Sequence, residues 1–149
     1  MTDFATAREE LRAAELALMQ QREAVAAQRR CLPPGPIVDD YVFSSSKGDV
    51  RLTELFTSPD RTLILYHFMY GKQQTSPCPM CSAWADGWNA IAHHVARRVD
   101  FVVAAAAPIA DWMQVVEARG WTNLRHASAG SSAFKLDIGG EDDAGNQWP

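Results

Sequence analysis

Residues 61–90, RTLILYHFMYGKQQTSPCPMCSAWADGWNA, decide which fold this chain adopts. The run at 61–70 is almost continuously apolar and rich in aromatic and branched residues, which predicts a central strand buried on both faces. A polar loop follows, and then a helix is predicted from Pro79 to about Arg97. The side of this helix expected to be buried carries an apolar stripe, Trp84, Trp88, Ile91 and Val95. Two cysteines therefore lie where a strand passes into a helix.

The segments on either side extend this pattern. Residues 41–56, YVFSSSKGDVRLTELF, predict a strand, a turn at 47–49, a second strand and a short helical turn. VDFVVAAAA at 99–107 is another apolar strand, and a helix is expected from Pro108 to Arg119, where Gly120 ends it. NLRHASA predicts a short strand, and residues 129–149 look mostly like loop. Alternating strands and helices predict an α/β domain with parallel pairing, whose sites lie beyond the carboxyl ends of the strands.

Residues 1–31 are interpreted as one long helix before an α/β domain at 32–149, because residues 3–30 contain neither Gly nor Pro and a Pro-rich linker follows. Thr6 and Glu9 have the spacing of a capping box. Apolar side chains recur every seven residues, with small or polar residues between them. The repeating positions are Phe4, Leu11, Leu18 and Val25, with Ala7, Ala14, Gln21 and Gln28 as companions. The helix could lie across its own domain or pair with a second copy in a homodimer.

Charge and cysteine usage limit the partners and the compartment. The net charge of −4 leaves no positive excess for binding nucleic acid or anionic membranes. The first fifteen residues lack an apolar core, so no secretory signal is expected, and no stretch approaches the ~18 apolar residues of a membrane span. Three cysteines, two of them at C-x-x-C spacing, do not make a disulfide framework, so we expect a reducing, cytoplasmic setting.

The C-x-x-C pair is typical of dithiol redox chemistry. Cys78 is expected at the start of the helix, with Pro79 at the first helical position, where a missing N–H costs nothing. Free N–H groups and the helix dipole favour a thiolate there, which is the nucleophilic form. Cys81 is expected to point inward, so an exposed nucleophile would stand beside a sheltered resolving thiol. Two structural thiols that never react would fit the same pattern.

Metal and haem sites fit less well, and no metal or cofactor is expected. His93 and His94 lie 12 and 13 residues after Cys81, which is ~18 Å along a helix and too far to share one ion. Only His67 could be a local ligand. Haem attachment requires a His directly after the second Cys, and residue 82 is Ser.

Several nearby residues are candidates for supporting roles. His67 could accept the proton of Cys81, or be a core histidine satisfied by hydrogen bonds. Asp86 could act similarly, or be a solvated helix residue, and Trp84 could shield a disulfide, or simply pack in the core. Thr75 stands three residues before Cys78. The third cysteine, Cys31, is interpreted as an incidental thiol.

Six segments together resemble an uncharacterised bacterial family of thioredoxin-like proteins, a domain of unknown function related to the alkyl hydroperoxide reductase and thiol-specific antioxidant group. They are LPPGPIVDDYVF, LTELF, LILYHFMYG, CPMCSAWAD, ARGW and FKLDIGGEDDAGNQWP. The resemblance implies a thioredoxin-like fold with an N-terminal helical extension and a Cys78–Cys81 dithiol, with His67, Trp84 and Asp86 as motif positions. The family continues past NQWP into a closing β-hairpin, so we expect either a truncated sheet or an edge completed by another chain.

The expected function is that of a thiol–disulfide oxidoreductase with antioxidant character, in which Cys78 attacks a disulfide and Cys81 resolves it. Its partners would be a protein or small-molecule disulfide and a thiol reductant. A thiol peroxidase using Cys78 is the first alternative. Thr75 matches half of the peroxidase motif, Gly71 stands where that motif has Pro, and Arg119 and Arg125 are the downstream arginines. A non-enzymatic redox-sensing or interaction module is the second alternative.

Overall fold

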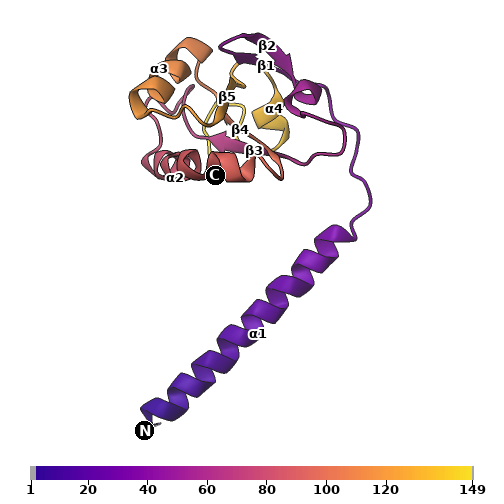
Figure 1. The fold of residues 1–149 in the computed structure, drawn as a ribbon, viewed down its shortest axis with the longest axis vertical. Coiled ribbons are helices and arrows are strands. Elements are labelled where there is room, and N and C mark those ends of the chain that lie inside the picture. The colour runs from indigo at the N-terminus through magenta and orange to yellow at the C-terminus, as the bar shows by residue number, and fades with distance from the viewer. Residues whose placement is uncertain (1–2, 149) are drawn as a thin grey trace. The chain divides into compact units, whose positions relative to one another are not determined.

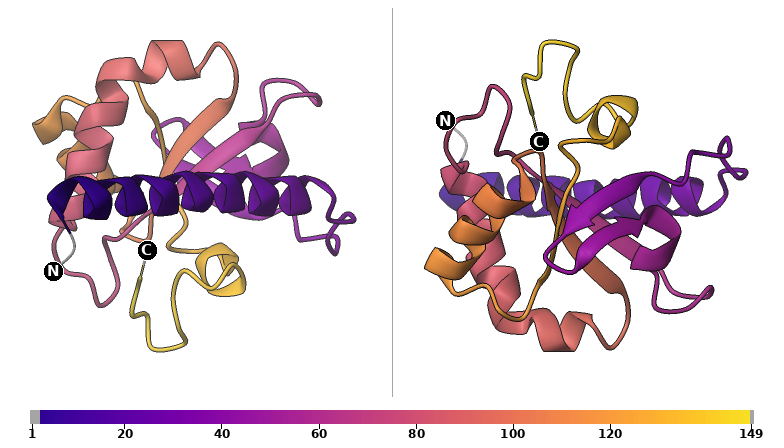
Figure 2. Two further views of the ribbon diagram at one scale, coloured as in Figure 1. Left: turned by 90° about the horizontal axis from the view of Figure 1, so that it is seen from below. Right: turned by 90° about the horizontal axis from the view of Figure 1, so that it is seen from above.

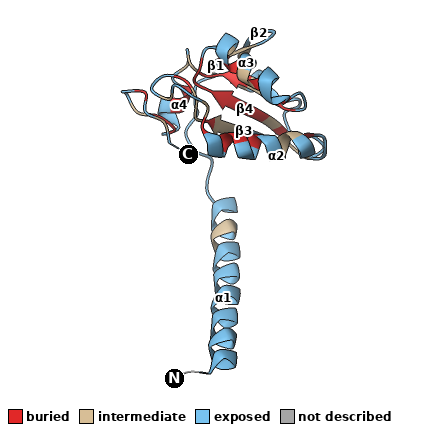
Figure 3. Ribbon diagram, turned by 90° about the vertical axis from the view of Figure 1, so that its left-hand side faces the viewer, coloured by how far each residue is buried: buried red, intermediate tan, exposed pale blue. Residues whose placement is uncertain are grey.

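A computed structural model describes residues 3–148 and divides the chain into two compact units, Met1–Val38 and Asp39–Pro149. The first unit holds helix α1, Phe4–Arg30, which confirms the predicted helix. Its cap differs from the prediction, because Asp3 is the N-cap residue and Thr6 and Glu9 lie inside the helix. No residue of α1 is buried, as Figure 3 shows along its length.

The second unit is built on one five-stranded mixed sheet flanked by helices (Figure 1). The strands are β1 Val42–Ser45, β2 Gly48–Arg51, β3 Leu63–Phe68, β4 Asp100–Ala105 and β5 Arg125–Ser128. Their order across the sheet is β2-β1-β5-β4-β3, with β3, β4 and β5 parallel and β1 antiparallel to both of its neighbours. The fold is the mixed α/β class that the sequence predicts, consistent with a thioredoxin-like arrangement.

Strand β3 was predicted at the centre of the sheet, and that prediction is wrong. Within the described chain β3 pairs with β4 alone, in a register that sets Phe68 opposite Ala105, so it forms an edge. β4 lies inside the sheet between β3 and β5, and five of its six residues are buried. The predicted burial on both faces is also wrong, because Phe68 is the one buried residue of β3 and Ile64 is 44% exposed. An apolar run does not determine whether a strand is flanked by one neighbour or two.

The helices form layers on the two faces of the sheet. Helices α2, Pro79–Val95, and α3, Ile109–Arg119, pack on one face, and the 3₁₀ turn η1, Leu52–Leu55, and helix α4, Phe134–Asp137, pack on the other. Figure 2 shows α2 and the C-terminal segment on opposite sides of the strands. Gly120 adopts φ +68 at the end of α3, which confirms the predicted stop.

The buried stripe of α2 differs from the prediction. Its buried residues are Cys81, Ser82, Ala85 and Ala92, whereas Trp84 is 55% exposed and Ile91 48% exposed. Small side chains let α2 approach the sheet closely, which leaves the large ones at its flank. Trp88 packs edge-on against Tyr66, with ring centroids 4.4 Å apart, and Trp84 stacks on Trp88.

The segment after β5 was predicted as loop, but it is closely packed. It contains α4, and Lys135 and Glu141 within it are almost completely buried. Its contacts reach distant parts of the unit: Tyr41 donates to Asp137 at 2.7 Å, and Gln147 donates to the carbonyl of Gly71 at 2.7 Å. The segment therefore covers the face of β3 that the helices leave free.

Candidate functional site

The loop after β3 fixes the position of the dithiol. Gly71 and Gln74 exchange two backbone hydrogen bonds, and the Cys78 N–H donates to the carbonyl of Met69 at 3.1 Å. Gly71 has φ +97, and a Cβ there would come within 2.2 Å of the Ala107 nitrogen. Only glycine fits at this position, which explains why it does not carry the Pro of the peroxidase motif. The two cysteines follow the carboxyl end of β3, as the alternation of strands and helices predicted.

Cys78 is the N-cap residue of α2, with Pro79 at the first helical position, as predicted. Burial acts to raise the pKa of its thiol, but hydrogen bonds from the backbone N–H and thiol of Cys81 and from the N–H of Met80 lower it, and the net shift is downward. The prediction that Cys78 is exposed is wrong, because the residue is only 8% exposed. The first turn of the helix thus favours a thiolate inside a sheltered site.

Cys81 is 3% exposed, and its thiol has the opposite tendency. Burial raises the pKa of Cys81, hydrogen bonds from the Tyr66 hydroxyl and the Met69 N–H lower it in part, and the nearby Cys78 raises it again. All three cysteines of the chain are free thiols in this structure, and Cys31 is exposed. The pKa is therefore lowered at Cys78 and raised at Cys81, so Cys78 loses its proton more readily.

Tyr66, rather than His67, is the side chain of β3 that meets the dithiol. Successive residues of a strand point to opposite faces, and Tyr66 and Phe68 belong to the core beneath α2 and α3. His67 lies on the other face with Leu65. The prediction that His67 accepts the proton of Cys81 finds no contact to support it, and we assign it no role at the sulfurs. The alternation along β3 was the signal that could have identified Tyr66.

His67 is enclosed by the C-terminal segment. A Cβ on Gly140 would come within 3.0 Å of the His67 Nδ1, so the backbone lies directly on the ring. Neither ring nitrogen has a hydrogen-bond partner within residues 3–148. Burial, and secondarily the charge of Lys135, lower the pKa of His67 to about 4, which keeps the ring neutral. The other interpretation, a core histidine satisfied by hydrogen bonds, is wrong, because both ring nitrogens are enclosed without a partner in the described chain.

A cluster of charged residues lies buried on the same face as His67. Lys135 is fully buried and donates from Nζ to the carbonyl of Phe68 at 2.8 Å and to Gln147 Oε1 at 3.1 Å. Glu141, 4% exposed, pairs with Lys72 through one carboxylate oxygen. Its other oxygen has no partner within the described chain. No pattern in the sequence distinguished these residues from a surface loop.

The remaining predicted residues lie around the dithiol but not on it. Asp86 accepts a hydrogen bond from the indole N–H of Trp121 at 2.7 Å, and Arg119 lies 3.4 Å from its other oxygen. It links the motifs CPMCSAWAD and ARGW and is not simply solvated. Thr75 is exposed in the loop before Cys78, and Trp84 is exposed at the flank of α2.

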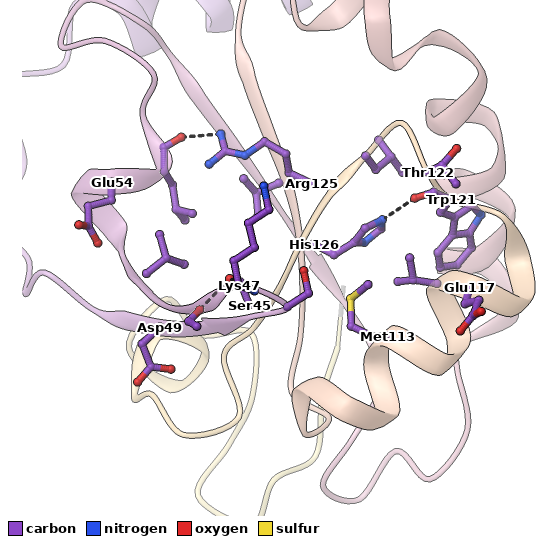
Figure 4. A pocket seen from close by; sticks show the side chains of 17 residues that line it. Ser45, Lys47, Asp49, Glu54, Met113, Glu117, Trp121, Thr122, Arg125 and His126 are labelled. Atoms are coloured by element: carbon purple, nitrogen blue, oxygen red, sulfur yellow. Dashed lines mark hydrogen bonds between the residues drawn. The ribbon is translucent and has the colours of Figure 1, made fainter.

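A surface groove lies apart from the thiols. A groove of about 950 Å³ opens between the β1–β2 hairpin, α3 and β5 (Figure 4). Lys47, Glu54 and Arg125 line it together with His126, whose Nε2 lies 3.0 Å from the carbonyl of Trp121. None of its lining residues comes from the 61–90 stretch. The groove is therefore separate from the candidate active site.

Comparison with known proteins identifies a family but no characterised relative. A family model described as "Bacterial protein of unknown function (DUF899)" matches residues 1–147. No curated protein and no solved structure matches the chain. Across residues 3–148, none of the helices combines the length and the apolar character that crossing a membrane requires. In the same residues no group of three or more His, Cys, Asp or Glu side chains could hold a metal ion.

Proposed function

The chain belongs to this family of bacterial proteins of unknown function, and we propose that it is a thioredoxin-like thiol–disulfide oxidoreductase that uses Cys78 and Cys81. The observation that carries the proposal is the placement of the two thiols: Cys78 is the N-cap residue of α2, and Cys81 is buried in its first turn. At the first turn of α2 the pKa of Cys78 is lowered by donors that outweigh its burial, whereas the pKa of Cys81 is raised by burial. A nucleophile that ionises first and a second thiol that ionises later are what the two steps of disulfide exchange require.

The reaction proceeds in two exchanges. The Cys78 thiolate attacks one sulfur of a substrate disulfide, a Cys78–substrate disulfide forms, and the other substrate sulfur leaves as a thiolate that takes up a proton. Cys81 then loses its proton and attacks the Cys78 sulfur, which forms the Cys78–Cys81 disulfide and releases the second substrate thiolate. The substrate gains two electrons, the dithiol is oxidised by two, and an external thiol reductant restores it.

The arrangement of arginines favours a disulfide over a peroxide as substrate. A peroxidase of this general fold would need an arginine close to Cys78. Arg119 instead lies against Asp86, and Arg125 donates to the carbonyl of Leu55 at 2.8 Å. Thr75 is exposed. The peroxidase and the non-enzymatic sensor remain predictions that no specific contact favours.

Reduction of insulin disulfides by the protein, with dithiothreitol as the reductant, tests the proposal. We expect wild-type protein to accelerate precipitation of the insulin B chain and Cys78→Ser to abolish the acceleration. Reduced Cys81→Ser, mixed with insulin after the dithiothreitol has been removed, should trap a mixed disulfide. Cys31→Ser is the matched control, since this exposed thiol lies outside the site, and it should keep full activity. Equal rates for wild type and Cys78→Ser would show that the proposed function is wrong.

A further inference from the structure

The groove drawn in Figure 4 arises where the sheet opens. Strands β1 and β2 stay paired up to the turn between Ser45 and Gly48, whereas β1 and β5 pair only where Ser44 faces Ser128. On its other side β5 keeps its register with β4 as far as Arg125. The hairpin and the first part of β5 are therefore left as two separate walls, and α3 lines the opening beside them.

Hydrogen bonds hold a cation on each of these two walls. In the hairpin, Ser45 Oγ donates to the carbonyl of Gly48 at 2.7 Å and accepts the backbone N–H of Lys47 at 3.2 Å. On β5, Arg125 donates from Nη1 to the carbonyl of Leu55 at 2.8 Å. Figure 4 shows the Lys47 amine and the Arg125 guanidinium extending toward one another across the groove. The two cations are thus carried by ordered backbone, as a pre-formed site requires.

Positive charge is in excess where these side chains meet. Asp100 Oδ1 lies 3.9 Å from Arg125 Nη1, and Asp100 Oδ2 lies 3.4 Å from Arg61 Nε. One buried carboxylate therefore serves two guanidinium groups. Lys47 adds a third cation, and its amine makes no hydrogen bond or ion pair among residues 3–148. A ligand that brings one negative charge would balance this excess.

The acidic side chains of the groove point away from the Lys47 amine. Asp49 Oδ1 accepts a hydrogen bond from Ser44 Oγ at 3.0 Å, and Glu54 Oε2 accepts one from a backbone N–H of the hairpin at 2.7 Å. Glu117 projects from α3 at the far side (Figure 4). None of these three carboxylates is paired with Lys47 or Arg125 in the part of the chain that the structure describes.

The floor of the groove is apolar and carries no charge. Leu55, Val102, Val116 and Trp121 line it, and each of them is almost completely buried. His126 adjoins them. Its Nε2 lies 3.0 Å from the carbonyl of Trp121, which can only accept, so Nε2 holds the proton. Burial lowers the pKa of His126, although this hydrogen bond acts to raise it, and the ring is therefore neutral near pH 7.

We propose that this groove binds a small organic anion, with its acidic group between Lys47 and Arg125 and its apolar body on the floor. Ammonium and guanidinium groups are strong donors to carboxylates and similar anions, and the Arg125 fork offers N–H groups beyond the one that meets Leu55. The volume of about 950 Å³ is large enough, since small-molecule sites commonly measure about 300–1,000 Å³.

This site is distinct from the dithiol. Arg125 is the first residue of β5, so the groove opens at the amino ends of the parallel strands. Cys78 follows the carboxyl end of β3, at the opposite end of the same sheet. The proposal therefore does not rest on the proposed function.

Two matched dyes test the proposal through their fluorescence on binding. Anilinonaphthalene sulfonate is an organic anion with an apolar aromatic body, and N-phenylnaphthylamine has the same body without the charge. We expect Lys47→Met to weaken binding of the sulfonate dye about fivefold, the upper range for an exposed ion pair, and to leave binding of the neutral dye unchanged. The substitution keeps the backbone N–H that Ser45 accepts. An unchanged affinity for the sulfonate dye, or an equal loss for both dyes, would overturn the proposal.

Arg97→Met is the matched control. Arg97 is an exposed cation just beyond the end of α2 and lies outside the groove, and its replacement removes the same charge. The variant should bind both dyes as wild type does. A loss of sulfonate binding equal to that of Lys47→Met would show that the dye responds to net charge alone, and the proposed site would be wrong.

Nuclear magnetic resonance locates the bound dye. When the sulfonate dye is titrated into wild-type protein, we expect the largest shifts at the backbone amides of Lys47 and Arg125 and at the indole N–H of Trp121. Shifts confined to the exposed side of α2, where Trp84 and Ile91 offer other apolar surface, would overturn the proposal. Neither measurement uses a disulfide, so the result is independent of activity toward insulin.

Discussion

The two faces of β3 differ in what they bury and in how the sequence encodes it. On the helical face, Tyr66 and Phe68 contact aromatic rings and the dithiol. On the other face, His67 and the backbone of Phe68 contact a segment that carries buried charges, Lys135 and Glu141. The helical face holds the two thiols, and the opposite face holds buried charges, one of which donates to the carbonyl of Phe68. The thiols lie in CPMCSAWAD and the buried charges in FKLDIGGEDDAGNQWP, so two segments that carry the family resemblance meet at opposite faces of one strand.

The largest effect is expected on the helical face. Phe68 is fully buried, and its ring centroid lies 4.7 Å from that of Trp112 and 5.8 Å from that of Trp121. Phe68→Ala should lower the free energy of unfolding by about 3–5 kcal/mol, because it removes these contacts and leaves a cavity. Urea denaturation followed by tryptophan fluorescence measures the change.

Leu65→Ala is the matched substitution on the opposite face. Leu65 is only partly buried, and the loss should be roughly 1–2 kcal/mol. Equal losses from the two variants would mean that the faces contribute equally to stability, against the comparison drawn above.

The second effect is a dependence of stability on pH that arises on the charged face. The pKa of Lys135 is lowered from 10.5 to about 7 in the folded protein. Between these values the unfolded chain holds a proton that the folded chain has released, so stability rises with pH across this window, by up to about 1.4 kcal/mol per pH unit. Urea denaturation from pH 7 to 9, in a Cys31→Ser, Cys78→Ser, Cys81→Ser background, measures the slope without thiol titration.

Lys135→Met in the same background is the comparison for this slope. The variant should lose most of the rise in unfolding free energy, whatever its stability at pH 7. If the free energy of unfolding rises equally with pH in wild type and variant, Lys135 does not titrate in this range. The charged face then adds no pH dependence that the helical face lacks.

The sequence predicted what depends on local pattern. The strand before the loop, Pro79 at the start of α2 and the stop at Gly120 all follow from short-range rules of backbone conformation, and the structure confirms them. The position of β3 at an edge, the shift of the buried stripe of α2 and the burial of Lys135 depend on contacts between distant segments. Composition does not distinguish a solvated polar loop from a buried polar segment, so the sequence did not predict that Lys135 and Glu141 are buried.

The smallest effect concerns an exposed residue that supports the helical face. Asp86 Oδ1 accepts the indole N–H of Trp121, a residue that is 1% exposed. Asp86→Ala leaves that buried N–H without an acceptor, which should lower the free energy of unfolding by about 1–2 kcal/mol.

Asp86→Asn separates hydrogen bonding from charge, because the amide keeps an acceptor oxygen and loses the charge that faces Arg119. We expect it to stay within about 0.5 kcal/mol of wild type in urea denaturation, as we expect of Arg119→Ala, since the ion pair is 3.4 Å long and half exposed. If Asp86→Asn and Asp86→Ala were equally destabilising, charge rather than the acceptor would hold Trp121. The helical face would then depend on electrostatics as the opposite face does.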